Sequence, residues 1–176
     1  VLDIDGETYS SITIAQEAPL IPVGSKELRP HRLAVGLYDI SGDLLKLRKS
    51  VELDVTGAST VVADLAGEKV ADLLLINDRD LSYAKLRFDD RSIATLKTHL
   101  GKLDDALARS LCWAAIWDMH RDAEISSSDF IEIALNGLAG ETDDAIVNIV
   151  LSQLGTSVEA YTQQANRNSL REKLAD

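Results

Sequence analysis

Apolar and polar residues alternate along much of the first half of the chain. A period of two is typical of half-buried β-strands, and a short unbroken apolar run is typical of a strand buried on both faces. Strands are therefore predicted at residues 8–15, 31–38, 45–55, 60–62, 73–76 and 83–88. Ser41 and Gly42 interrupt the alternation and predict a hairpin, because glycine readily supplies the positive φ of a tight turn.

Two segments refine this picture. Residues 73–76 read Leu-Leu-Leu-Ile, which predicts a strand covered on both faces. Residues 18–25 contain prolines and a glycine, and we expect a loop there, because proline cannot donate a ladder hydrogen bond. Short strands punctuated by turns favour an antiparallel β-sandwich.

After Asp89 and Asp90 the apolar residues recur every three and four positions, which is the spacing of amphipathic helices. Gly101 and Gly155 are expected to end two of these helices. Ser126 with Asp129 three residues later resembles a capping box at a helix start. The predicted helices cover residues 92–100, 103–117, 126–138, 146–154 and 157–174, of which the last is the most polar.

The pattern as a whole predicts an α+β chain in sequence order. An N-terminal antiparallel β-sandwich domain is expected at residues 1–89, and an all-α, solenoid-like region at residues 90–176 would be the N-terminal part of a helical domain. Helices joined by short loops stack as antiparallel pairs, in a bundle or in an α-solenoid, and no internal repeat decides between the two.

Composition and charge narrow the function classes. The chain has 176 residues, of which 45% are hydrophobic and 27% charged, as in an ordinary globular protein. Its net charge of −11 repels phosphate backbones and anionic lipid, so we expect no nucleic-acid and no membrane-surface role. The longest uncharged apolar run, at residues 111–117, is far too short to span a bilayer.

The cysteine content and the first residues bear on the cellular compartment of the protein and on whether the chain is part of a longer one. Cys112 is the only cysteine, which excludes an internal disulfide and is compatible with the cytoplasmic location that we expect. It lies in an apolar run, where a buried structural thiol is the usual interpretation and a reactive thiol the alternative. The chain begins at Val1 without an initiator methionine or a signal-type segment, which suggests an excerpt from a longer protein.

Histidines and carboxylates offer only a weak candidate for a metal site. His31, His99 and His120 include no pair spaced four apart, the spacing of a helical zinc site. A patch of ionisable residues around His120 could hold a metal. The ordinary explanation for such a patch is a helix end, where a cationic side chain interacts with the helix dipole and the carboxylates are solvated. We therefore assign no metal ligand. The patch consists of Asp118, His120, Asp122 and Glu124.

The remaining residues form no catalytic constellation. The chain has no Gly-x-Ser-x-Gly elbow, no glycine-rich phosphate loop and no Cys-x-x-Cys pair. Trp113 and Trp117 could form a ligand platform, although at helical spacing they are more typical of a core. Adjacent aspartates lie at turns or helix starts, where capping explains them; they are Asp89 and Asp90, Asp104 and Asp105, and Asp143 and Asp144. We assign no catalytic residue, and substrate-binding residues stay unknown.

Four stretches of the chain carry one family resemblance. They are residues 11–17 (SITIAQE), 28–38 (LRPHRLAVGLY), 75–86 (LINDRDLSYAKL) and 111–124 (LCWAAIWDMHRDAE). Each is weak as a motif, but their order and spacing make the set specific. Together they resemble the region behind the catalytic domain of zinc aminopeptidases of the aminopeptidase N type, the gluzincin family, and bacterial members most closely.

The resemblance implies a β-sandwich domain followed by the first helices of a C-terminal helical domain. It also implies that the H-E-x-x-H zinc site and the Gly-x-Met-Glu-Asn motif that grips the substrate amine lie upstream, because neither maps onto a residue here. The fragment is then expected to hold no cofactor and to have no activity of its own, whereas its parent would be a zinc-dependent aminopeptidase. In the parent, the sandwich would be a spacer and the helices a cap that limits entry to the active-site chamber.

Two function classes follow from the sequence. The first is a non-catalytic part of a zinc exopeptidase that removes N-terminal amino acids, with the upstream catalytic domain and, through it, peptide substrates as partners. The second is a stand-alone protein-interaction module without enzymatic activity. Apolar residues around the helices at 130–138 and 146–154 further predict an exposed patch and truncation-induced self-association.

Overall fold

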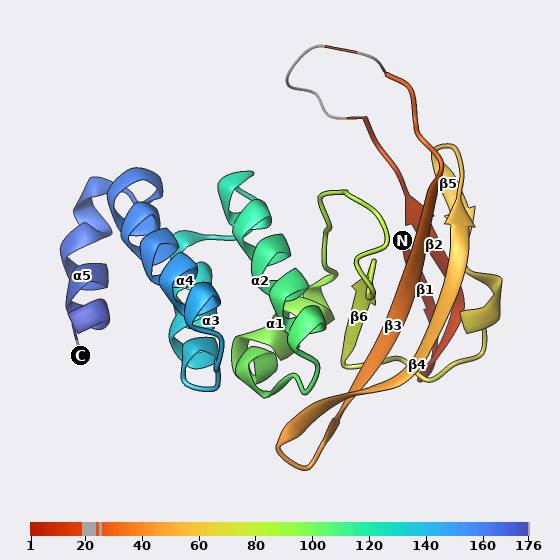
Figure 1. The fold of residues 1–176 in the computed structure, drawn as a ribbon, viewed down its shortest axis with the longest axis horizontal. Helices are drawn as coiled ribbons and strands as arrows, with labels where there is room; N and C mark the ends of the chain where they lie inside the picture. Colours follow the sequence, from red (N-terminus) through yellow and green to blue (C-terminus); the bar gives the residue numbers. More distant parts are fainter. Residues whose placement is uncertain (19–23, 25, 176) are drawn as a thin grey trace.

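The computed structural model describes residues 1–18, 24 and 26–175. Figure 1 shows β-structure at one end of the molecule and helices at the other, with the N-terminus in the β-region and the C-terminus at the far end of the helices. Among the described residues, the last strand ends at Ile76 and the first α-helix begins at Asp90. The predicted order of an antiparallel β-region and then a helical region is confirmed.

The β-region contains two three-stranded antiparallel sheets among the described residues. The first, in the order β1-β2-β5, is formed by β1 (Leu2–Asp5), β2 (Thr8–Ala15) and β5 (Ser59–Val61). The second, in the order β4-β3-β6, is formed by β3 (His31–Ser41), β4 (Leu44–Val55) and β6 (Leu73–Ile76). Five of the six predicted strands are therefore confirmed, and β1 is an additional strand too short for a periodic signal.

The two sheets enclose the first hydrophobic core. Tyr9 and Ile12 of β2 lie in this core with Val35 and Leu37 of β3, and none of the four is more than 2% exposed. Burying a large apolar side chain stabilises a fold by about 1.5–3 kcal/mol, so this core accounts for the pairing of the sheets. The predicted β3–β4 hairpin also forms, with Gly42 at a φ of 63° in its turn.

The helical region contains five α-helices within the described part of the chain. They are α1 (Asp90–His99), α2 (Ala106–Arg121), α3 (Ser127–Leu138), α4 (Asp144–Thr156) and α5 (Arg167–Ala175). A side-chain oxygen caps the N-terminus of each of the first four, and the capping residues are Asp89, Asp105, Ser126 and Asp143. These caps satisfy backbone N–H groups that have no partner inside the helix, as the aspartate pairs and the Ser126 motif predicted.

The second hydrophobic core is shared by the sheet β4-β3-β6 and the helices. Tyr38 of β3 and Leu73 and Leu75 of β6 are buried there with residues of α1, α2 and α3. Leu74 lies in the first core instead, so β6 is covered on both faces as predicted. The sheet β4-β3-β6 is thus a middle layer that packs on the sheet β1-β2-β5 on one side and on helices on the other (Figure 1).

The predicted strand at residues 83–88 is wrong. These residues have no regular secondary structure and pair with no neighbouring strand. Leu86 and Phe88 are buried in the second core, whereas Lys85 and Arg87 form ion pairs with residues beyond the end of α2. The alternation therefore reflects a segment that buries Leu86 and Phe88 in the second core, and it carries no information about a partner strand.

Two helix boundaries also differ from the prediction. Gly155 does not end a helix, because its φ is not positive and α4 continues to Thr156 and then into a π-helical turn at Ser157–Tyr161. The single helix predicted at residues 157–174 is likewise wrong. A break at Thr162 separates the π-helical turn from a 3₁₀ turn at Gln164–Asn166 and from α5.

Three glycines allow α3 to approach the 3₁₀ turn that follows α1. Gly101 and Gly140 face each other, and a Cβ added to Gly101 would collide with the carbonyl oxygen of Gly137. A Cβ added to Gly137 would lie 2.6 Å from the indole ring of Trp113. Backbone packing this close requires glycine at these positions.

The loop predicted at residues 18–25 lies outside the described residues, apart from residues 18 and 24. None of the helices in the described part combines the length and the apolar composition that a membrane crossing requires.

Candidate functional site

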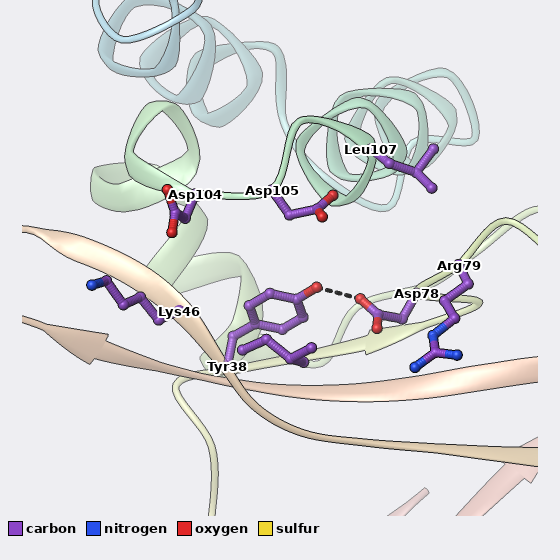
Figure 2. A pocket seen from close by; sticks show the side chains of 8 residues that line it. Tyr38, Lys46, Asp78, Arg79, Asp104, Asp105 and Leu107 are labelled. Atoms are coloured by element: carbon purple, nitrogen blue, oxygen red, sulfur yellow. Dashed lines mark hydrogen bonds between the residues drawn. The ribbon is translucent and has the colours of Figure 1, made fainter.

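A hollow of about 520 Å³ lies where the middle sheet meets the helices (Figure 2). It is a candidate site because it brings ionisable side chains of the β-region and the helical region together. Its lining residues are Tyr38, Lys46, Leu47, Asp78, Arg79, Asp104, Asp105 and Leu107.

The floor of the hollow contains a buried tyrosine–carboxylate pair. The Tyr38 hydroxyl donates to Oδ1 of Asp78 (Figure 2), and Ser50 Oγ donates to Oδ2 at 3.2 Å. Burial, together with the hydrogen bond to Asp78, raises the pKa of Tyr38 well above its ordinary value, so the phenol stays a donor. Gly36 makes the pair possible, because a Cβ at that position would lie 2.7 Å from Cγ of Asp78.

Other charged groups around the hollow serve structural contacts. Asp105 accepts a hydrogen bond from the Ala108 backbone N–H at 2.8 Å, and Arg79 donates to Glu52 at 2.8 Å. Within the described part of the chain, no group of three or more His, Cys, Asp and Glu residues is arranged to hold a metal ion. Asp105 and Arg79 of the lining therefore serve structural contacts, and the described residues around the hollow offer no metal site.

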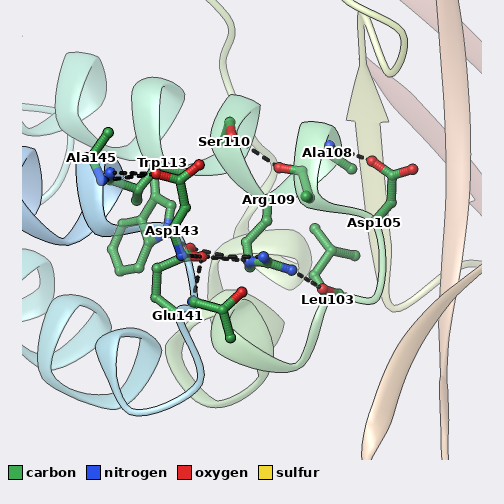
Figure 3. A network of polar contacts seen from close by, with 12 residues as sticks. Leu103, Asp105, Ala108, Arg109, Ser110, Trp113, Glu141, Asp143 and Ala145 are labelled. Carbon is green, nitrogen blue, oxygen red and sulfur yellow. Dashed lines mark hydrogen bonds and ion pairs between the residues drawn. The ribbon is translucent and has the colours of Figure 1, made fainter.

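A second polar centre joins α2 to the loop between α3 and α4 (Figure 3). Glu141 accepts hydrogen bonds from Nε of Arg109 and from Nε1 of Trp113, each at 3.0 Å. Arg109 also donates to the Leu103 carbonyl at 2.7 Å. Burial would raise the pKa of Glu141, but the hydrogen bonds from Arg109, Trp113 and two backbone N–H groups outweigh burial and lower this pKa. The arrangement fixes a loop and leaves no free group for chemistry.

The weak metal candidate at residues 118–124 is occupied by ion pairs. Lys85 contacts Asp122 at 2.9 Å, and Arg87 contacts Glu124 at 2.6 Å and Asp122 as well. The hydrogen bond from Lys85 is the main cause of the lowered pKa of Asp122. We call these four side chains the clasp, because they hold residues 85–88 against the end of α2.

His120 is a buried structural residue. Its Nε2 lies 2.9 Å from Ser157 Oγ, its Nδ1 lies 3.4 Å from the Ile125 carbonyl oxygen, and its ring stacks on Phe130 at 4.8 Å. Burial lowers the pKa of His120, which favours the neutral ring. Ser157 is 0% exposed, so the serine–histidine contact holds the π-helical turn in place and is closed to a substrate.

The other sequence candidates lie apart from one another. His31 starts β3, whereas His99 is at the end of α1, where its Nδ1 lies 2.8 Å from Thr98 Oγ1. Cys112 is buried, and burial raises the pKa of its thiol, so it is an unreactive core residue. Trp113 lies in the second core. Trp117 packs against this core and also contacts Phe130, so neither indole ring is part of an open ligand platform.

Several residues that organise the site carry no local sequence signal. Arg109 and Glu141 are 32 residues apart, and His120 and Ser157 are 37 residues apart. Such partners are recognised only when the fold brings them together. The single signal in the sequence is that Arg109 and His120 lie among the apolar residues of one helix, where a buried charge or ring nitrogen needs a partner.

The comparisons with known proteins agree with this architecture. Residues 73–176 match the family model of the ERAP1-like C-terminal domain, which begins at the first residue of β6. The chain belongs to this family. It is also 42% identical over 172 residues to Aminopeptidase N of Streptomyces lividans, a match that covers 96% of this chain and 20% of that protein. The chain spans about a fifth of the length of this relative, and it corresponds to a non-catalytic, C-terminal part of an aminopeptidase N-like protein.

Proposed function

We propose that this chain is the spacer and the beginning of the helical cap of a zinc-dependent aminopeptidase that removes N-terminal amino acids from peptides in the cytoplasm. The observation that carries the proposal is the middle sheet, which contributes side chains to both hydrophobic cores. A sheet packed on both faces joins the β-region to the helices without a flexible linker between them. The match to an aminopeptidase over 96% of the chain supports this function over that of a stand-alone interaction module.

The helices would act by shaping access to the catalytic chamber. In the parent enzyme, zinc and the groups that activate water would be held upstream, and they would supply the hydrolysis. The chain described here would hold the helical wall at a fixed angle, so that peptides enter and folded proteins do not. Its partners would be the upstream catalytic domain and, through it, the peptide substrate.

The test compares substrates of different size in the full-length parent enzyme. Leu45 lies in the core shared with the helices, Leu65 lies in the core between the sheets, and both are 0% exposed. Leu45→Ala and Leu65→Ala therefore form a matched pair with similar costs in stability. We expect Leu45→Ala to change the ratio of kcat/KM for long peptides to kcat/KM for an aminoacyl-p-nitroanilide, and Leu65→Ala to leave this ratio unchanged. Equal ratios in both variants and the wild type would contradict the access-shaping role.

A further inference from the structure

The carboxylate at the floor of the hollow is buried beside neutral groups only. Asp78 is 6% exposed, and its two oxygens accept hydrogen bonds from the hydroxyls of Tyr38 and Ser50. Within the described part of the chain, no lysine, arginine or histidine forms an ion pair with Asp78. Aspartate is almost never buried to this extent without a charged partner, so the surroundings of Asp78 favour a cation.

The two cationic side chains that line the hollow are directed elsewhere. Arg79 donates to Glu52 at 2.8 Å and forms an ion pair with it. Lys46 lies on the far side of the Tyr38 ring from Asp78, and its ammonium group is directed away from Asp78 (Figure 2). A carboxylate has about four acceptor positions, of which the two hydroxyls occupy two. Asp78 can therefore accept further hydrogen bonds from the open space of the hollow.

A second carboxylate borders this space from the helical region. Asp105 caps α2 through Oδ1, which accepts from the Ala108 N–H at 2.8 Å. Its carboxylate lies across the hollow from the Tyr38 hydroxyl and Asp78 (Figure 2). The cap uses one oxygen of Asp105 and leaves Oδ2 for another donor. A guanidinium group suits two separate carboxylates, because its five N–H donors point outward in one plane.

The rim of the hollow adds an apolar surface. Leu47 of β4 and Leu107 of α2 belong to the lining and are 47% and 46% exposed. Arginine and lysine place their methylene groups along apolar surface while the charged head reaches a polar partner. The volume of about 520 Å³ lies in the range of ligand pockets. Leucines above carboxylates therefore favour an organic cation with an aliphatic stem over a bare metal ion.

We propose that the hollow binds a guanidinium group on an aliphatic stem, which donates to Asp78 and Asp105 while the stem packs on Leu47 and Leu107. An arginine side chain of a peptide and a free alkylguanidine share this chemistry. The net charge of −11 favours the approach of either cation. This binding site goes beyond the proposed function, because neither peptide cleavage nor the role of the helices as a cap requires it.

Saturation-transfer difference NMR on the full-length parent tests the site with three probes. Two are cations, N-acetylarginine methylamide and n-butylguanidine, and the third is N-acetylcitrulline methylamide, the neutral isostere of the first. At about 0.15 M NaCl, which screens exposed charges, we expect a Kd of about 1 mM for the arginine probe. The citrulline probe should bind at least about tenfold more weakly, because it loses the charge-assisted hydrogen bonds. Equal binding of these two probes would overturn the proposal.

Three variants of the parent locate the binding. Asp78→Asn and Asp105→Asn remove charge and keep the shape, and asparagine caps a helix as well as aspartate does. Asp143→Asn is the matched control, because Asp143 caps α4 in the same way and is not part of the lining. We expect each of the first two to weaken the arginine probe at least about tenfold and the control to have no effect. Unchanged binding in Asp105→Asn, which changes an exposed residue, would overturn the proposal even if Asp78→Asn fails to fold.

The remaining comparisons separate the sources of the cation and the two proposals. Tighter binding of N-acetylarginine methylamide supports a peptide side chain as the ligand, and tighter binding of n-butylguanidine supports a free small molecule. Binding by the isolated chain without binding by the parent would overturn the proposal, because another part of the polypeptide would then fill the hollow. A parent that binds the arginine probe but has no aminopeptidase activity would keep this site and overturn the proposed function.

Discussion

Glu141 and Arg109 form an ion pair that is almost completely removed from solvent, with side-chain exposures of 0% and 9%. The pair links the first turns of α2 to the loop between α3 and α4, across 32 residues of sequence. Trp113 and the Leu103 carbonyl complete its hydrogen bonds. A buried charge whose partner is removed strongly destabilises the folded state, so each residue of the pair can stay buried and charged only with the other present.

Removal of one member of this pair should strongly destabilise the helical region. We expect Arg109→Met to lower the free energy of unfolding by about 3–5 kcal/mol, because it leaves the Glu141 carboxylate buried without a cation. The matched control is Arg171→Met, which breaks an ion pair with Glu159 whose members are 52% and 56% exposed and should cost less than about 1 kcal/mol. Urea unfolding measures both changes, and equal changes in the two variants would contradict the importance of the buried pair.

The stability of the chain should fall as the pH drops below about 6.5, because of His120. Burial lowers the pKa of His120 in the folded state, so the unfolded chain binds the proton first. The stabilising contribution is present above the pKa of the unfolded state and is lost as the pH falls through the folded pKa. His120→Leu should remove this slope, as measured by urea unfolding between about pH 7.5 and pH 5.5. A wild-type slope of the opposite sign, or one that survives in His120→Leu, would show the assignment to be wrong.

Two glycines should respond to alanine in opposite ways. Gly101→Ala should destabilise the chain by several kcal/mol, about 2–4, because the added Cβ collides with the backbone of Gly137. Gly155→Ala should stabilise it by about 0.5–1 kcal/mol, because Gly155 is in α4 and an added Cβ meets no atom within 4 Å. Thermal unfolding separates the two effects, and a neutral Gly101→Ala would contradict the close approach of α3.

The last helices should cause self-association of this chain. Leu135, Ile149 and Leu151 are 40%, 56% and 53% exposed, and nothing in the described part of the chain covers them. Apolar surface of this kind favours association. Light scattering over a concentration series should show dimers for this chain and monomers for a version extended by further native helices. Equal monomeric behaviour of both versions would show that the exposed side chains do not drive association.

Local features of the fold were predictable from sequence because neighbouring residues determine them. The Ser126 cap, the Gly42 turn and the doubly buried strand at residues 73–76 each follow from a few adjacent positions. The strand predicted at residues 83–88 shows the limit of this reasoning. Alternation reports which side chains are buried, and pairing depends on whether another strand is near.

The candidate site was less predictable than the fold. The Tyr38–Asp78 contact spans 40 residues, and Gly36 matters only because Asp78 comes to lie beside it. Gly155 was misleading for a related reason, because glycine permits a left-handed helix end without requiring one. Chemistry that depends on distant residues needs the fold before it can be recognised.

The central claim is that this chain is a non-catalytic part of an aminopeptidase. The most direct test measures the release of p-nitroaniline from aminoacyl-p-nitroanilides, together with bound zinc, for the purified chain and for the full-length parent. We expect no release and no stoichiometric zinc for the chain, since no metal-binding group exists among its described residues, and chelator-sensitive release for the parent. Chelator-sensitive release by the chain alone, or a parent without any release, would contradict the claim.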